Sequence, residues 1–174
     1  AHQIAVNVES VSYMPGFGLA VAATTLAGQA LGAGKENLAE ASIRRTMAFA
    51  LMVMGSMALV FGLFGPQVVK VFGATPEVLT LAGLAVRLAA LEQLPIAVQM
   101  VLSGSLRGAG DTRTPMIVTV VGTLLFRVSA VYLLAIVLHL GLAGVWLGTA
   151  VDWTGRAILL YLLFQRGTWK GVRV

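Results

Sequence analysis

The sequence contains no cysteine and few charged residues. Without cysteine, the chain forms no disulfide and offers no thiolate ligand to a metal. Asp, Glu, Lys and Arg make up 11% of its 174 residues, against about 25% in soluble domains. So few charges would not cover the surface of a soluble protein of this size. Lipid is therefore the expected partner of much of the apolar surface.

Groups that carry enzyme chemistry are also scarce. The two histidines, His2 and His139, stand alone near the ends of apolar segments, with no nucleophile or acid arranged beside them. The glycine-rich stretch 32–35 ends in lysine, as a phosphate-binding loop does. However, Gln29 occupies a required glycine position, and Glu36 follows the lysine where Ser or Thr is needed. The sequence therefore indicates neither an enzyme nor a cofactor.

Long apolar segments are abundant, and apolar residues make up 58% of the chain. A membrane-spanning helix needs about 20 mostly apolar residues. Five segments meet this requirement: residues 4–31, 46–72, 78–103, 116–138 and 142–164. They are rich in Leu, Ala, Gly and Met and lack alternation of period two, which favours helices over a barrel. The predicted fold is an all-α, polytopic bundle of about five transmembrane helices.

Basic residues gather in alternate connections between these segments. Eight lie in the first and third connections and the C-terminal tail: Lys35, Arg44, Arg45, Arg107, Arg113, Arg166, Lys170 and Arg173. The second connection holds only Lys70. The positive-inside rule then predicts that the C-terminus lies in the cytoplasm. We expect a multi-pass protein of the cell inner (plasma) membrane, with its basic residues near anionic lipid headgroups. Aromatic residues do not interleave with a dense basic patch, so nucleic acid is not an expected partner. Trp146 and Trp169, near predicted ends, are expected to be interfacial anchors.

Glu92, Gln99 and Ser103 fall on one face of the third predicted helix. Pro95 lies between them and removes a backbone donor, which predicts a kink. A carboxylate in mid-membrane costs roughly 2.5–3.5 kcal/mol on insertion scales. Glu92 therefore has two interpretations. It is a proton or cation site on a substrate pathway, or it is a structural carboxylate bonded to neighbouring helices.

The fifth predicted helix carries Asp152 and Arg156 four residues apart, which favours a structural intrahelical pair. Gly144 and Gly148 form a GxxxG step that predicts close helix packing. Arg127, deep in the fourth helix, needs an interhelical partner or water. Asp152, Glu92 and Glu9 are the available acids, and the sequence does not choose among them.

Glu9 lies in a polar stretch of the first predicted helix, followed by the breakable run Pro15-Gly16-Phe17-Gly18. That stretch either lines an outward-facing cavity or is solvated at the interface. The chain also begins at Ala1, without Met and directly in a full-length apolar segment. We therefore expect further sequence upstream.

Several ordered motifs resemble the multidrug and toxic compound extrusion (MATE) family. They are residues 1–5 (AHQIA), 14–18 (MPGFG), 28–34 (GQALGAG) and 106–113 (LRGAGDTR), and 144–146 (GVW) with Asp152 and Arg156 fit the same pattern. The resemblance implies a drug/proton or drug/sodium antiporter with twelve helices in two pseudo-symmetric lobes. It also implies that this chain is a C-terminal lobe without its first helix. The missing N-terminal lobe and a small organic substrate are then expected partners.

The resemblance fails at one position. In sodium-coupled members a carboxylate binds the cation at the position that matches Ile96 here, so that ligand is not carried over. Glu92, one turn away, is a candidate by location only. Two other functions stay open: a flippase for lipid-linked precursors, which would have a more basic central cavity, and a non-transporting membrane scaffold.

Overall fold

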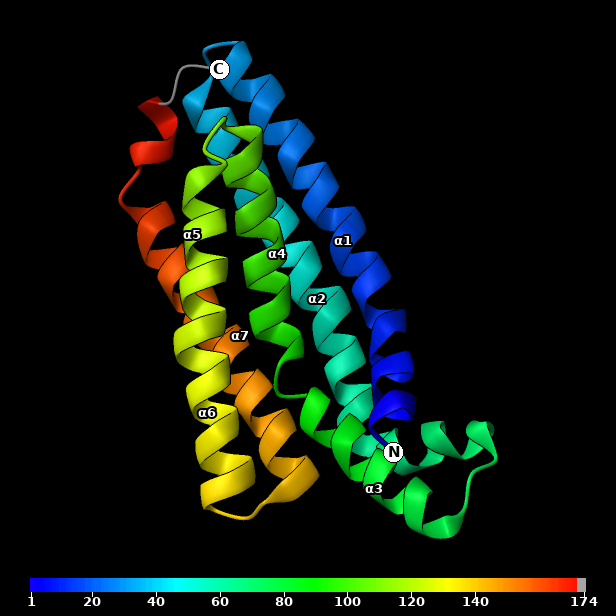
Figure 1. Cartoon of the computed structure of the whole chain (residues 1–174). Helices are drawn as coiled ribbons and strands as arrows, with labels where there is room; N and C mark the ends of the chain where they lie inside the picture. Colours follow the sequence, from blue (N-terminus) through cyan, green and yellow to red (C-terminus); the bar gives the residue numbers. More distant parts are fainter. Residues whose placement is uncertain (172–174) are drawn as a thin grey trace.

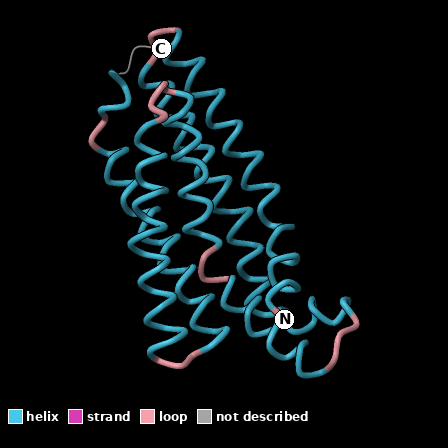
Figure 2. The backbone as a smooth tube through the Cα atoms, viewed as in Figure 1, coloured by secondary structure: helices cyan, strands magenta, loops and turns pink. Residues whose placement is uncertain are grey.

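A computed structural model describes residues 1–171, which form a bundle of long helices without a strand (Figures 1 and 2). The all-α prediction is therefore confirmed. The elements are α1 (His2–Gly32), α2 (Glu36–Val69), η1 (Lys70–Phe72), α3 (Pro76–Ala89), α4 (Gln93–Gly108), α5 (Arg113–Gly122), η2 (Thr123–Val128), α6 (Ser129–Val131), η3 (Tyr132–Val137), α7 (Gly141–Gln165) and η4 (Thr168–Gly171). Arg173, assigned to the basic tail, lies outside the described residues.

Among the described residues, four unbroken helical stretches are long and apolar enough to cross a membrane, and α3 with α4 makes a fifth, bent span. In chain order, the first span (α1), the fourth span (Arg113–Val137) and the last span (α7) agree with the predicted segments within a few residues. The helix of the second begins at Glu36 rather than at residue 46, and the Glu40–Arg44 ion pair of 2.8 Å supports this extra length. A search of the sequence for apolar runs detects only the part of such a helix that lies in lipid.

The third predicted span is broken at residues 90–92, and α3 and α4 meet at a bend of 51°. Pro95 explains the position of the break. Because Pro95 has no backbone N–H, the carbonyl of Leu91 loses its helical donor, and the proline ring crowds the same turn. The predicted kink is therefore confirmed. It leaves Glu92 at the N-cap of α4.

The breakable run at residues 15–18 does not interrupt the first helix. Helix α1 is continuous through Pro15 and Gly16. It packs on α4 through small residues, because a Cβ on Gly104 or Gly108 would collide with backbone oxygens of α1. Thr24 Oγ1 lies 2.9 Å from the carbonyl oxygens of both Ala20 and Gly104, so its shared hydrogen bond joins the two helices. This close crossing joins α1 to the second half of the bent span.

The fourth span and α7 also pack through glycines. A Cβ on Gly144 would lie 2.6 Å from backbone atoms of Ala135, and one on Gly148 would lie 2.6 Å from a methyl carbon of Val131. Close packing at the GxxxG step is therefore confirmed. Most of the fourth span after Gly122 is π-helical, in η2 and η3.

Large apolar side chains cover the outside of the bundle. They are most evident on α2 and on the fourth span, and include Leu59, Leu63, Met116, Leu124, Leu125 and Ile136. The core in turn contains many alanines, among them Ala23, Ala27, Ala50 and Ala97. Small residues inside and large apolar residues outside are typical of helices that pack in lipid.

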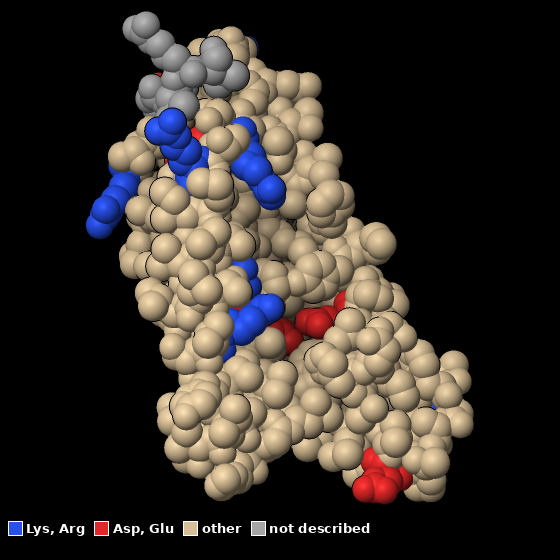
Figure 3. All heavy atoms as spheres, viewed as in Figure 1, with Lys and Arg blue, Asp and Glu red and all other residues tan. Residues whose placement is uncertain are grey.

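The two ends of the bundle differ in charge. The end of α1, the α4–α5 connection and the end of α7 lie together at the top of Figure 1, and Figure 3 shows basic side chains gathered there. The N-terminus at Ala1 and the turn between η3 and α7 lie at the opposite end. The tryptophan prediction is wrong, because Trp146 and Trp169 are buried. Trp169 Nε1 donates to the Phe164 carbonyl at 3.0 Å, and its ring stacks on the Phe164 ring.

Candidate ion and substrate site

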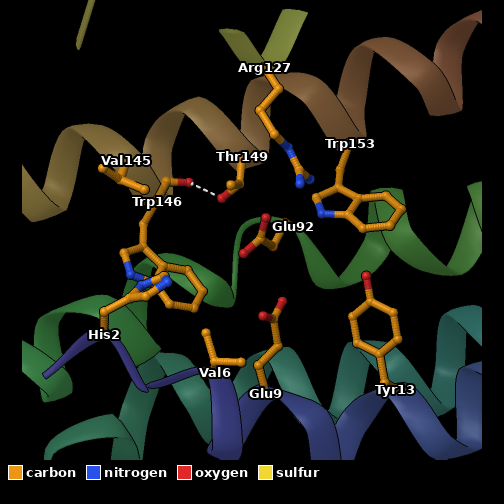
Figure 4. Close-up of a pocket in the computed structure, with 10 residues that line it drawn as sticks. All are labelled: His2, Val6, Glu9, Tyr13, Glu92, Arg127, Val145, Trp146, Thr149 and Trp153. Carbon is orange, nitrogen blue, oxygen red and sulfur yellow. Dashed lines mark hydrogen bonds between the residues drawn. The ribbon is translucent and has the colours of Figure 1, made fainter. Parts of the chain in front are cut away.

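A polar cavity of about 240 Å³ lies where α1, the α3–α4 break, η2 and α7 meet. Figure 3 shows acidic and basic side chains together in a hollow midway along the bundle. The lining, drawn in Figure 4, consists of His2, Val6, Glu9, Tyr13, Glu92, Arg127, Val145, Trp146, Thr149 and Trp153. Carboxyl groups, one guanidinium and aromatic rings therefore share a small space inside an otherwise apolar bundle.

Two carboxyl groups face each other across this cavity (Figure 4). Glu92 is 1% exposed, and its Oε2 is buried without a hydrogen-bond partner. The break places it at the start of α4, where the helix dipole favours a negative charge. Glu9 approaches from α1, and Thr149 lies beside Glu92 with its hydroxyl donating to the Trp146 carbonyl at 2.8 Å.

Asp152 lies behind the cavity and binds two arginines. Arg156 Nη2 donates to its Oδ2 at 2.6 Å, and Arg127 Nε lies 2.8 Å from the same oxygen. Asp152 is fully buried, and its other oxygen, Oδ1, has no hydrogen-bond partner. The predicted pairing of Asp152 with Arg156 is confirmed. The interhelical partner of Arg127, which the sequence left open, is Asp152.

Aromatic rings hold this charged group in place. The Arg156 guanidinium lies 4.1 Å from the centre of the Trp153 ring, within range of a cation–π interaction. Tyr13 meets Trp153 edge-on at 6.1 Å between ring centres, and His2 meets Trp146 at 5.7 Å. Tyr13 belongs to the polar stretch of the first predicted helix that either lines a cavity or is solvated at the interface, whereas no sequence feature assigned Trp146, Trp153 or His2 to the cavity. The spacing of Trp146, Thr149 and Trp153 along one helix face was an available signal.

Gln99 and Ser103 do not reach this cavity. Gln99 Nε2 donates to Ser103 Oγ at 3.3 Å, and both line a separate cavity of about 260 Å³ between α4 and α5. Glu92 and Gln99 are seven residues apart, or about 10 Å along a helix. A shared helix face therefore does not bring the three residues into one site. Ile96 is fully buried in the apolar core between them.

The site has the chemistry to hold a cation. Glu9, Glu92 and Asp152 carry three negative charges when ionised, whereas Arg127 and Arg156 carry two positive charges. One proton or one monovalent cation would bring the group to neutrality, which a low-dielectric surrounding favours. Three or more His, Asp or Glu side chains do not converge into a metal site among residues 1–171.

Comparison with known proteins identifies the family of this chain. The sequence profile of the MatE family matches residues 1–133. The probable multidrug resistance protein NorM of Thermotoga maritima is 32% identical over 97% of this chain. The multidrug resistance protein MdtK of Yersinia pseudotuberculosis is 36% identical over 92% of it. The chain spans about 36% of the length of each relative.

Solved structures agree with this result. The eukaryotic MATE transporter AtDTX14 superimposes with a TM-score of 0.86 at 26% identity, over 97% of this chain and 38% of that protein. A MATE in a bent conformation superimposes with a TM-score of 0.84, and at 20% identity it supports the fold alone. With a family profile that matches most of its length, this helical membrane chain belongs to the multidrug and toxic compound extrusion family.

Proposed function

We propose that the protein containing this chain exports small organic compounds, many of them cationic, in exchange for inward H⁺ or Na⁺. The observation that carries this proposal is the pair of facing carboxyl groups, Glu9 and Glu92, inside the bundle. Ionisable side chains at such depth are costly and are found where ions or substrates pass. The names of the relatives NorM and MdtK supply multidrug resistance as the context.

In the proposed cycle, the coupling ion and the organic cation compete for the same negative charge. The ion neutralises the Glu9–Glu92 pair when the site faces outward. The substrate cation binds when the site opens inward and the ion has left. Tyr13, Trp146 and Trp153 offer ring faces that attract an organic cation. Alternating access would rock this lobe against a second, N-terminal lobe.

We also propose an orientation of the chain in the membrane, from the positions of its basic residues. Lys35, Arg107 and Arg113 lie at the end of the bundle that we place in the cytoplasm, together with the C-terminus. The plasma membrane is the proposed location.

A flippase for lipid-linked precursors is not favoured by the charges of the cavity. Such substrates carry anionic phosphates, and a cavity that recognises them would be lined by basic side chains. Here Arg127 is joined by the two carboxyl groups of Glu9 and Glu92. A scaffold without transport activity would lose only stability when these carboxyl groups are changed.

The test is transport by the whole native protein in proteoliposomes, with ethidium as the probe. We expect an imposed pH or sodium gradient to drive ethidium accumulation. Glu92→Gln or Glu9→Gln should reduce it by about tenfold or more, because a neutral amide cannot exchange an ion for a cation. Glu77→Gln is the matched control, because Glu77 is exposed at the start of α3. The proposal would be refuted if both the Glu92→Gln and the Glu9→Gln variants accumulated ethidium at the wild-type rate.

A further inference from the structure

We propose that Arg127 is a movable internal cation: it rests on Asp152 while Glu9 and Glu92 hold the coupling ion, and it turns to Glu92 when that ion leaves. This inference rests on the proposed ion-coupled transport and adds a positioning residue to it. The inference follows from the difference between the two arginines of the site, because Arg156 is held firmly on Asp152 and Arg127 is held less firmly.

Asp152 does not need Arg127 for its charge to be neutralised. Arg156 lies on the same helix, donates to Asp152 Oδ2 at 2.6 Å and has a side chain only 5% exposed. The Trp153 ring covers its guanidinium at 4.1 Å. Asp152 with two arginines carries one excess positive charge, so Arg127 is the surplus member of the group.

Arg127 is also the less firmly held of the two arginines. Its side chain is 36% exposed, and its guanidinium lies 5.8 Å from the centre of the Trp153 ring. Although Nε lies 2.8 Å from Asp152 Oδ2, its N–H is not directed at that oxygen and makes no hydrogen bond. The contact with Asp152 is therefore electrostatic attraction without an aligned hydrogen bond, which is easier to exchange.

A second acceptor is available on the other side of Arg127. Glu92 Oε2 is buried and lacks a donor, and Arg127 is the one arginine among the described residues lining this cavity. Figure 4 shows Arg127 extending from η2 across α7 toward the space that holds Glu92 and Glu9. The titratable groups that face it are His2, Glu9 and Tyr13 from α1, Glu92 from the start of α4, and Asp152 and Arg156 from α7.

The backbone that carries Arg127 supports such a movement. Residues 123–128 form a π-helix, a rare geometry that often marks functional sites. Gly122 precedes this turn and lies directly against the Arg156 side chain, leaving no room there for a Cβ. Arg156 is therefore fixed against the fourth span, while Arg127 projects from its wider turn toward the cavity.

Movement of Arg127 would enforce coupling. When the ion leaves the Glu9–Glu92 pair, Arg127 supplies the missing positive charge and neutralises Glu92. One negative charge then remains on the Glu9–Glu92 pair, and an arriving organic cation or coupling ion competes for it and displaces Arg127. Without Arg127, the pair would be open to either cation independently, and the gradient would no longer drive export.

The experiment compares two transport modes of the whole native protein in proteoliposomes. Ethidium accumulation under an imposed ion gradient reports coupling. Ethidium exchange at equal concentrations on both sides, without a gradient, reports substrate binding and passage. For Arg127→Gln, we expect accumulation to fall about tenfold while exchange persists, and Arg127→Lys should restore part of the accumulation. Arg87→Gln, at an exposed arginine of α3, should change neither mode.

Two results would overturn the inference. Arg127→Gln with wild-type accumulation would show that no internal cation is needed. Loss of both modes in a variant that keeps the wild-type melting temperature would assign Arg127 to substrate passage itself rather than to coupling. If the wild-type protein shows exchange but no gradient-driven accumulation, the proposed function fails instead, independently of Arg127.

Discussion

At the scale of single residues, Asp152 and Arg156 hold the charged part of the site together. Both are almost completely buried, and their bond links neighbouring turns of α7 at the point where the fourth span packs. Arg127 joins them from another helix. A buried ion pair contributes little net free energy when intact, but removal of one partner leaves an uncompensated charge. The two arginines should therefore respond differently to substitution.

Arg156→Met removes the buried partner of Asp152 and should lower the free energy of unfolding by about 3–5 kcal/mol. Arg127→Met should cost less, because its side chain is partly exposed and Arg156 still neutralises Asp152. Melting temperatures of the purified variants in one detergent would check this order. Equal destabilisation by the two changes would contradict the unequal roles of the arginines.

At the scale of helices, glycines decide how closely the spans approach. A Cβ added to Gly144 would lie 2.6 Å from backbone atoms of residues 134 and 135. The backbone cannot move aside as a side chain can. Gly18, in α1, has open space at the same position. The break before α4 belongs to this scale as well, because the proline places Glu92 at a helix start rather than within a helix.

Gly144→Ala should destabilise the bundle by about 1–3 kcal/mol, because the added methyl group overpacks the contact between α7 and the fourth span. Gly18→Ala is the matched control. It adds the same methyl group without a contact and should be neutral or stabilising by up to about 1 kcal/mol. Thermal unfolding of both variants under identical conditions measures the difference. A similar melting temperature for the two would contradict the close packing.

At the scale of the whole molecule, the distribution of basic residues predicts the orientation in the membrane. The end that holds Lys35 and the α4–α5 connection is basic, whereas the opposite end is not. We therefore expect the basic end to lie at the inner leaflet, where anionic headgroups attract it. The cavity with Glu9 and Glu92 lies between the two ends.

The absence of native cysteine within this chain makes the orientation directly testable. Ala33→Cys, in the α1–α2 turn, should react with a membrane-impermeant maleimide only when the cytoplasmic face is exposed. Ala74→Cys, between η1 and α3, should react from outside intact cells. The labelling of each variant is measured as an increase in its apparent mass on a gel. Labelling of the first site in intact cells, with protection of the second, would show the opposite topology.

The sequence by itself determined the helical class, the location in lipid and the positions of the spans. These follow from local properties, because apolar length, charge scarcity and a proline act through the chain's immediate neighbours. The Asp152–Arg156 pair and the Gly144–Gly148 contact were predictable for the same reason, since their spacing lies within one helix.

Only the tertiary structure decided which distant residues meet. It paired Arg127 with Asp152, placed Glu9 opposite Glu92, and separated Glu92 from Gln99 and Ser103. It also buried Trp146 and Trp169, although their positions near predicted ends were typical of interfacial anchors. Such contacts depend on how helices rotate and cross, which the packing of glycines and the 51° bend set for the molecule as a whole. The periodicity of one helix carries no information about the angle at which it meets another.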